Sequence, residues 1–226
     1  MRINKLLSNY GYCSRKETNR IIEDNRILVN GKPCIVGQWV EETDEILLDH
    51  QPIQKSEKIY LAFNKPTGIT CTLERTVSDN IIDFIDFDKY IFPVGRLDKA
   101  SEGLILLTND GDLANKILES DNDHEKEYIV TVDKPFDDTF LQGMAHGVEI
   151  CGVLTRHCKI DKISEMTFKI ILTQGLNKQI RRMTKVFGYN VVSLQRIRIL
   201  NIPIDGIESG KWRNLTSSEL LFLHAL

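Results

Sequence analysis

The chain has 226 residues, of which 42% are hydrophobic and 27% are charged. This length allows one or two domains, and a composition close to the globular average excludes a wholly disordered chain, a collagen and a coiled coil. No apolar run approaches the roughly 18 residues that span a membrane, and the first residues lack the apolar core of a signal peptide. We therefore expect a cytoplasmic protein with no membrane partner.

The residue types that can form disulfides or bind metals are scattered along the chain. The cysteines are Cys13, Cys34, Cys71, Cys151 and Cys158. Their odd number and the lack of a C-x-x-C pair predict free thiols in a reducing compartment. The single local grouping, His157 and Cys158 with Cys151, is a poor ligand set because adjacent side chains of a strand point to opposite faces. The sequence therefore predicts no metal site.

The net charge of −3 does not suggest a polyanionic partner, but the charges are unevenly distributed. Residues 1–32 hold seven basic and three acidic residues, a local charge of +4. Residues 174–198 hold six basic and no acidic residues. Two basic segments on a mildly acidic chain suit a phosphate backbone as partner. The alternative is that each segment is only a solvated face.

The first fifty residues predict a compact module of two helices and a small sheet. A short first helix precedes Gly11, and Ser14 and Glu17 have the spacing of a capping box at the start of a second helix. Asn25 stands where a left-handed residue ends that helix. The next predicted strands are residues 27–29 and 45–48. The polar residues 51–58 after them predict a linker. The first domain is therefore assigned to residues 1–50.

From residue 59 onward strand patterns dominate. The predicted strands are residues 59–63, 68–72, 91–94, 103–107, 128–132, 153–160, 166–172 and 191–200. The predicted helices are residues near 79–85, 112–119, 137–145, 177–187 and 217–224. Many strands joined by turns, with occasional helices, indicate an α+β fold with a mainly antiparallel sheet, here in a second domain over residues 59–226.

Three segments of the first module form a set: Arg2-Ile-Asn-Lys-Leu-Leu, Gly11-Tyr-Cys-Ser-Arg and Arg26-Ile-Leu-Val-Asn-Gly. Together they resemble the S4 RNA-binding domain, which implies that this module binds RNA. The cations that we expect to contact phosphates, without reading bases, are Lys5, Arg15, Lys16 and Arg20. Lys16 and Arg20 share a helix face because they are four residues apart. A small protein-interaction module is the alternative.

Four segments of the second domain form another set: Asn64-Lys-Pro-Thr-Gly68, Gly95-Arg-Leu-Asp98 with its continuation to Gly111, Lys126-Glu-Tyr128, and Gly175-Leu-Asn-Lys-Gln-Ile-Arg-Arg-Met183. Each alone is a weak signal, but in this order they resemble the bacterial ribosomal pseudouridine synthases that carry an N-terminal S4 domain. The resemblance implies a cofactor-free isomerisation of a uridine in RNA. The most similar branch acts on 23S ribosomal RNA, and transfer RNA is an alternative substrate.

Asp98 is the catalytic residue that the resemblance implies. Isomerising uridine requires the glycosidic bond to break and the base to rejoin the ribose through carbon. One carboxylate beside the ribose can act as a nucleophile at C1′ or as a base at C2′, and the sequence does not choose between them. Without the surrounding segments, an Asp after Gly-Arg-Leu predicts only a turn.

Arg181 stands at the position that the resemblance assigns to a salt bridge with Asp98, which favours the ionised carboxylate. The residues after Asn177 predict a helix with a basic face and an apolar core face. Its basic residues are Lys178, Arg181, Arg182 and Lys185, and its apolar residues are Ile180, Met183 and Phe187. The family places the residue before this arginine near the target base, whereas helical periodicity places Ile180 in the core, and both readings stay open.

Tyr128 matches the family position that stacks on the target base and deprotonates C5 of the product; a half-buried strand aromatic is the alternative. Arg96 is implied to help extrude the target nucleotide, because chemistry on a paired base requires flipping. Lys178 and Arg182 are expected to bind RNA. Lys65 is expected to hold either a phosphate or the local structure.

The sequence thus predicts a monomeric RNA pseudouridine synthase, an isomerase that needs no metal and no small-molecule cofactor. The alternative from another class is a non-catalytic RNA-binding or ribosome-assembly factor with a synthase-like fold. The presence of Asp98, Tyr128 and Arg181 together favours the enzyme. Trp39 and Trp212 are expected to be core anchors rather than platforms for bases.

Overall fold

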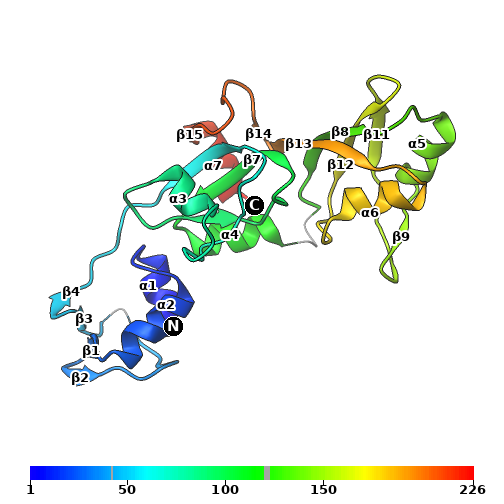
Figure 1. The fold of residues 1–226 in the computed structure, drawn as a ribbon. Coiled ribbons are helices and arrows are strands. Elements are labelled where there is room, and N and C mark those ends of the chain that lie inside the picture. The colour runs from blue at the N-terminus through cyan, green and yellow to red at the C-terminus, as the bar shows by residue number, and fades with distance from the viewer. Residues whose placement is uncertain (42, 120–122) are drawn as a thin grey trace.

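The structure is a computed structural model that describes residues 1–41, 43–119 and 123–226 (Figure 1). Its N-terminal module contains α1 (Ile3–Asn9), α2 (Arg15–Glu23) and a four-stranded sheet in the order β2-β1-β3-β4. The strands are β1 (Ile27–Val29), β2 (Lys32–Pro33), β3 (Ile46–Leu48) and β4 (Gln51–Pro52). Apolar side chains of both helices and of the sheet form its core, in which Ile3, Leu7 and Ile27 have no exposed surface.

The local structure of this module follows the predicted residue types, with two differences. Asn25 adopts the predicted left-handed conformation at φ 55°. Ser14 Oγ accepts the N–H of Glu17 at 3.1 Å, but the return bond from the Glu17 carboxylate does not form among the described residues, so the predicted capping box is half formed. Residues 51–52 of the predicted linker form β4, because their backbone pairs with β3.

A nine-stranded sheet, in the order β11-β12-β8-β13-β7-β5-β15 with β14 on β13 and β6 on β7, organises the second domain. Its strands are β5 (Tyr60–Lys65), β6 (Phe92–Val94), β7 (Glu102–Thr108), β8 (Lys126–Val132), β11 (Lys159–Lys162), β12 (Thr167–Leu172), β13 (Val191–Ile199), β14 (Ile202–Pro203) and β15 (Trp212–Asn214). The helices are α3 (Ile81–Ile85), α4 (Gly111–Leu118), α5 (Asp138–Ala145), α6 (Gln179–Val186) and α7 (Ser217–His224), and a separate hairpin joins β9 (Glu149–Ile150) to β10 (Val153–Leu154). Of the strand pairs in this sheet, β13–β7 is parallel and the others are antiparallel, which confirms the predicted α+β fold with a mainly antiparallel sheet.

Two predicted strands differ from the structure. Residues 68–72 form only a single bridge, between Thr70 and Asn80, because the chain turns at Gly68 with φ +88° and pairs with no strand of the sheet. The predicted strand 153–160 is two separate strands. β10 pairs with β9 and β11 pairs with β12, so the chain changes partner between them.

The sheet consists of two halves that meet where β13 touches β7 (Figure 1). In the half with β5 and β7, both faces are buried: Phe63 points into one core and Ala62 into another. In the half with β8 and β12, one face is buried, with Val130 and Phe168 in the core, while Glu127 on the other face forms an ion pair with Arg198 at 2.6 Å. The two halves are joined by two paired positions only, so the sheet opens at this junction.

The N-terminal module contacts the second domain through α1 and α4. Lys5 Nζ lies 2.8 Å from Asp112 Oδ1, and Lys58 Nζ donates to the Asn9 carbonyl at 3.2 Å. Tyr90 is half-buried in this contact beside Ser8, and this partial burial raises its pKa to about 12. The two domains therefore touch through a few polar contacts rather than a shared core.

Both tryptophans contradict their predicted role as core anchors. Trp39 is 71% exposed and Trp212 is 41% exposed, because Trp39 lies in a surface loop and Trp212 in the edge strand β15. The five cysteines are free thiols. Within the ranges that the structure describes, no helix combines the length and apolarity of a membrane span.

Candidate active site

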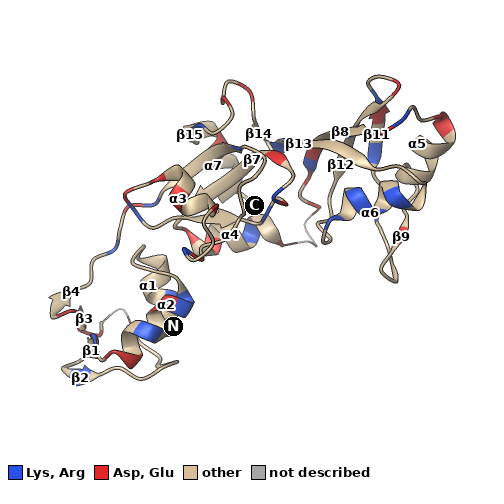
Figure 2. Cartoon of the chain, viewed as in Figure 1, with Lys and Arg blue, Asp and Glu red and all other residues tan. Residues whose placement is uncertain are grey.

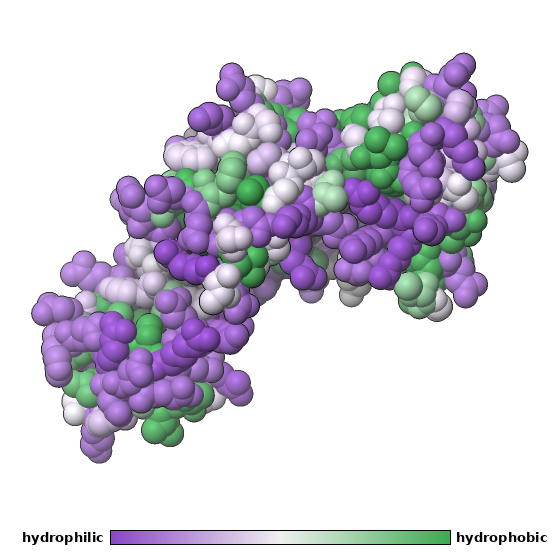
Figure 3. All heavy atoms as spheres, in the orientation of Figure 1, coloured by the Kyte–Doolittle hydropathy of each residue, from purple (hydrophilic) through white to green (hydrophobic). Residues whose placement is uncertain are grey.

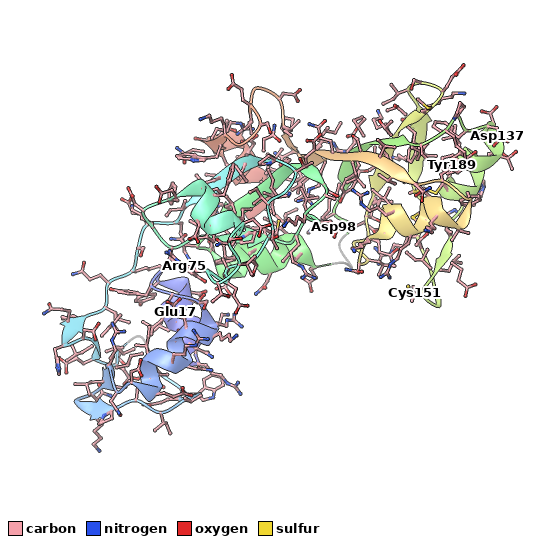
Figure 4. All side chains as sticks on the ribbon, viewed as in Figure 1. Glu17, Arg75, Asp98, Asp137, Cys151 and Tyr189 are labelled. Carbon is pink, nitrogen blue, oxygen red and sulfur yellow. The ribbon has the colours of Figure 1, made fainter. Side chains whose placement is uncertain are left out.

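A cleft of about 540 Å³ lies at the junction between the two halves of the sheet. It is lined by the loop after β6, by the start of β8, by β13 and by the residues that lead into α6. Figure 4 shows Asp98 between the half that carries α4 and the half that carries α6. Five of the residues selected from the sequence line this one cleft: Arg96, Asp98, Tyr128, Lys178 and Arg181.

The loop that carries Asp98 is anchored at several backbone positions. The Ser101 N–H donates to the Asp98 carbonyl at 3.0 Å, and the Gly68 N–H donates to the Lys99 carbonyl at 2.8 Å. The Lys99 side chain forms an ion pair with Asp79. These contacts tie the loop to the segment after β5, so the Asp98 backbone is fixed at the edge of the cleft.

Arg181 clamps the same loop against β13. Its Nη2 donates to the Ala100 carbonyl at 3.1 Å and to Ser101 Oγ at 3.2 Å, and its Nη1 donates to the Val191 carbonyl at 3.2 Å. Arg181 Nε lies 4.0 Å from Asp98 Oδ2, at the outer limit for an ion pair. The Asp98 carboxylate is 34% exposed and accepts no hydrogen bond from the described residues. Arg181 therefore orients the loop and leaves the carboxylate available to a ligand.

Ile180, near the start of helix α6, lies both in the core and at the cleft. Lys178 precedes the helix in a left-handed conformation at φ 52°, and regular helix begins at Gln179. Ile180 is 5% exposed and packs in the same core as Met183, yet it also lines the cleft. The core continues into the wall of the cleft at this point, so a buried residue of the helix can also border the site.

Tyr128 lies on β8, which is next to β13 in one half of the sheet. It is 9% exposed, belongs to the main core and lines the cleft. Its register partners are Arg196 on β13 and Ile170 on β12. The Tyr128 hydroxyl makes no hydrogen bond within the described part of the chain. Tyr128 is thus a largely buried strand aromatic that also borders the site.

Two further cations line the cleft that the sequence patterns leave unassigned, Lys126 and Arg196. Lys126 Nζ donates to the His124 carbonyl at 3.2 Å and Arg196 Nε donates to the Leu104 carbonyl at 2.6 Å, but neither pairs with an acid among the described residues. Arg196 is 4% exposed, and its Nη2 is buried with no partner in that same part of the chain. Burial and the charge of Arg196 lower the pKa of Lys126 to about 8. Because buried charges are normally paired, these two cations indicate a site built for an anionic ligand.

The sequence could have placed Lys126 at the site, because it lies two residues before Tyr128 and residues two apart on a strand share a face. The alternation of side chains along a strand does not identify Arg196 in the same way. Arg198 is two residues further, yet it pairs with Glu127 on the opposite face. The register of β13 against β8 shifts between Arg196 and Arg198, and such a bulge reverses the alternation of side chains. Sequence periodicity does not show this bulge.

Lys65 has a structural position. It is completely buried, and its ammonium donates to the Pro66 carbonyl at 2.8 Å and to the Ile69 carbonyl at 3.0 Å. Burial lowers the pKa of Lys65. A group without exposed surface does not reach a phosphate, so of the two roles expected from the sequence the structural one fits and the phosphate role is wrong.

The basic residues of segment 174–198 do not form one surface. Arg181 clamps the loop of the cleft, Arg196 is buried and Arg198 is neutralised by acids. Arg182 lies outside the cleft lining, where its guanidinium donates to Cys151 Sγ and Asn177 Oδ1, both at 2.8 Å. The exposed cations of the segment are Lys178 and Lys185. Of the six charges of the predicted patch, two are therefore exposed, three are half-buried and one is buried.

The basic residues of the N-terminal module also divide into two groups. Lys5 is engaged by Asp112, so this predicted RNA contact joins the two domains instead. Arg15, Lys16 and Arg20 are exposed and have no acidic partner among the described residues. Figure 2 shows basic residues in blue on α2 alongside acidic ones in red, and Figure 3 shows a mostly hydrophilic surface on this face of the module. The free cations of the module are therefore concentrated on α2.

Comparison with known proteins gives matches over the whole chain. The family model described as RNA pseudouridylate synthase matches residues 59–185, and the S4 domain model matches residues 1–46. Dual-specificity RNA pseudouridine synthase RluF of Escherichia coli K12 is 49% identical over 229 residues, which cover 100% of this chain and 79% of that protein. An uncharacterized RNA pseudouridine synthase of Aquifex aeolicus is 34% identical over 234 residues, covering 100% and 97%. A crystal structure of a pseudouridylate synthase, 27% identical, superposes with a TM-score of 0.72 over 99% of each chain.

Proposed function

Because the chain belongs to the RNA pseudouridylate synthase family, we propose that the cleft around Asp98 is where it isomerises uridine to pseudouridine in RNA. The family matches confirm the predicted enzyme class and the predicted S4 domain. The assignment of the cleft rests on one observation. The Asp98 carboxylate is partly exposed in the cleft and accepts no hydrogen bond from the described residues, on a loop that Arg181 holds in place.

The reaction exchanges one bond of the base for another. The N1–C1′ bond breaks, the C5–C1′ bond forms, C5 loses a proton and N1 gains one, so no atom is lost or added. Asp98 serves either by attacking C1′ or by removing the proton from C2′. Deuterium at C2′ separates these routes, because only proton removal there gives a primary kinetic isotope effect.

Tyr128 and Arg181 support Asp98 in different ways. Tyr128 borders the cleft from β8, where its ring can stack on the flipped uracil and its free hydroxyl can take part in the loss of the C5 proton. Arg181 acts as a positioning residue through the hydrogen bonds that it donates to Ala100 and Ser101. Its guanidinium also places positive charge beside the carboxylate, with Nε 4.0 Å from Asp98 Oδ2.

The cations of the cleft suit the phosphates next to the target uridine. Arg96 and Lys178 are exposed at the cleft and have no acidic partner in the described ranges, while Lys126 and Arg196 lie deeper in its wall. An arginine plane can fill the stack that a flipped base leaves, which is the role proposed for Arg96. Arg182 would contact RNA from outside the cleft, because its guanidinium lies toward the β9–β10 hairpin.

We assign 23S ribosomal RNA as the substrate, on the resemblance of the four segments to the large-subunit branch, and a monomer in the cytoplasm as the acting form. Relatives that are 49% identical are dual-specificity RNA pseudouridine synthases, so transfer RNA belongs in the same test. The experiment maps pseudouridines across all RNAs in a deletion strain, in its parent, and in the deletion strain that expresses Asp98→Asn. We expect one or a few sites to disappear on deletion and not to return with Asp98→Asn.

The purified proteins complete this test. Asp98→Asn is expected to bind RNA and to form no product, since the side chain keeps its shape but loses the charge and the proton acceptor. Asp88→Asn, at an exposed position of the same domain, is the matched control and is expected to be fully active. Multiple-turnover activity of Asp98→Asn would exclude the assigned role.

A further inference from the structure

Trp39 is exposed in a loop of the S4 domain. It lies neither in the cleft nor in the core of the domain. Ile35, Val36 and Trp39 are 69%, 52% and 71% exposed, within five consecutive residues of one loop. Isolated apolar side chains are common on protein surfaces, whereas a group of them marks an interaction site. This group is therefore a candidate contact surface.

The backbone of the loop is fixed on both sides of Trp39. The Ile35 N–H donates to Gln38 Oε1 at 3.0 Å, and the Ile3 N–H donates to the Gln38 carbonyl at 2.9 Å. On the other side, the Val40 N–H donates to the Met1 carbonyl at 2.8 Å. The indole of Trp39 is thus presented to solvent from an ordered backbone, which lowers the entropy lost when a partner binds.

Two cationic groups of the first two residues lie beside Trp39, although residues 33–50 around it hold five acids and no Lys or Arg. Arg2 is the antiparallel bridge partner of Trp39, and directly opposed residues of such a pair carry their side chains on the same face. The N-terminal ammonium donates to the carbonyl of Val40, the residue after Trp39. Arg2 is exposed and has no acidic partner among the described residues. Of the described acids that follow in the chain, Asp49 pairs with Arg26 and Asp44 accepts from the neutral Asn30, while Glu41 and Glu45 are exposed.

We infer that Trp39 is a stacking platform for an unpaired base of the RNA substrate, with Arg2 binding an adjacent phosphate. An aromatic ring beside unpaired cations is the combination that holds single-stranded nucleic acid. Bases inside a duplex offer no free face, so the ligand is a nucleotide in a loop, bulge or end. The inference rests on the proposed action on RNA and gives the S4 domain a contact with bases, in addition to its phosphate contacts.

Fluorescence tests this contact directly, because the chain contains two tryptophans. In Trp212→Phe the emission comes from Trp39 alone. A short labelled single-stranded RNA of mixed sequence is titrated into this protein, and binding is followed in parallel by anisotropy of the label. We expect the emission of Trp39 to be quenched in step with binding, and a duplex of the same strand to quench it much less.

Affinity measurements with matched variants provide the second readout. Trp39→Ala is expected to weaken binding of the single strand by about 5- to 150-fold, the range known for base–aromatic stacking, and Trp39→Phe by only a few-fold. Leu221→Ala, at an equally exposed apolar position on α7 of the second domain, should bind as the wild-type protein does. Trp39→Ala should leave the salt dependence of binding unchanged, since it removes no charge, while Arg2→Ala should reduce it.

The outcomes separate this inference from the proposed function. Unquenched Trp39 emission at saturating RNA, or an unchanged affinity of Trp39→Ala, would overturn the stacking contact while the enzyme assignment stands. Emission that changes with protein concentration in the absence of RNA would show an interface between copies of the chain, and would overturn it too. If product formation by the wild-type protein is absent, the proposed function fails instead. Trp39→Ala is expected to form product at saturating RNA.

Discussion

Gly103 of β7 and Arg196 of β13 meet at the point where the two halves of the sheet join. They are register partners in the parallel pair, and Gly103 has a φ of +105°. A Cβ atom on Gly103 would overlap the Arg196 carbonyl oxygen and lie 2.7 Å from its amide nitrogen. The missing side chain of Gly103 therefore lets the strands approach closely enough to hold Arg196 in the wall of the cleft.

We expect Gly103→Ala to lower the free energy of unfolding by at least about 2 kcal/mol, because a disfavoured backbone conformation is combined with a clash against backbone atoms. Denaturant titration measures this loss. Gly206→Ala is the matched control, since Gly206 also has a positive φ, +73°, but no atom lies within 4 Å of its added Cβ. The control should lose only about 1–2 kcal/mol. Equal losses in the two variants would contradict the close approach at Arg196.

Lys126 is expected to make the free energy of unfolding increase with pH in the alkaline range. Burial and the charge of Arg196 lower its pKa from 10.5 to about 8. Between these pH values the unfolded chain binds one more proton than the folded chain, so the free energy of unfolding rises with pH. The cost of burying the ammonium is fully present below about pH 8 and is lost as the pH approaches 10.5. Lys126→Met should therefore be more stable than the wild-type protein at pH 7, by about 1–2 kcal/mol after allowance for solvent.

Chemical denaturation of both proteins from pH 7 to pH 10 measures this difference. Other groups, such as the half-buried Tyr90, titrate in or near this range, but they are common to both proteins and cancel. Lys126→Arg is the control, because its charge persists through the whole range and its difference from Lys126→Met should stay constant. A constant difference between wild type and Lys126→Met would rule out the lowered pKa.

The residues proposed for catalysis could be selected from the sequence because four short segments carry a resemblance to one family. Asp98 and Arg181 belong to separate segments whose resemblance to one family implies a common site, and the structure places both at the cleft. Helix α6 could also be predicted from the sequence, because a period of 3–4 residues separates its basic residues from Ile180 and Met183. Local pattern and tertiary position agree in these cases.

Contacts between distant residues could not be predicted in the same way. A count of local charges includes Arg198, but its neutralisation by Glu127 depends on how β13 pairs with β8. Hydrophobicity alone favoured burial of Trp39, yet the loop that carries it is held by the N-terminal residues at the surface of a small domain. Sequence periodicity does not contain these relationships, because they arise from the register of strands and the docking of loops.

Removal of residues 1–56 tests whether the second domain folds and works alone. The sheet and both of its cores lie beyond this segment, and the cut retains the Glu57 carbonyl, which accepts from Asn109 Nδ2 at 2.8 Å. We expect one cooperative unfolding transition, weaker RNA binding and an unchanged single-turnover rate at saturating RNA. The intact chain measured under the same conditions is the control. A truncated protein that does not fold would show that the two domains depend on each other for stability, through contacts such as the one at Tyr90.

The salt dependence of RNA binding should identify the cations that contact phosphates. For single strands the slope of log K against log salt concentration is about −0.7 per neutralised phosphate. Lys16→Ala and Arg20→Ala remove exposed charges without acidic partners in the described ranges, so each should reduce the slope by about 0.7 or less and weaken all RNAs to a similar degree. Arg26→Ala is the control, because Asp49 already binds the Arg26 guanidinium through two hydrogen bonds. Its slope should equal that of the wild-type protein.

Arg96→Ala is expected to behave differently from these variants. Arg96 lines the cleft beside Asp98, and its proposed contact forms only when the target nucleotide has left the stack, so its loss should reduce the single-turnover rate more than the salt slope. Titrations of labelled RNA at several potassium concentrations, with single-turnover rates measured on the same proteins, give both quantities. A slope loss equal to that of Arg20→Ala, with an unchanged rate, would make Arg96 an ordinary phosphate contact. A flat salt response of the wild-type protein would instead show that neither the cations of α2 nor those of the cleft bind the RNA backbone.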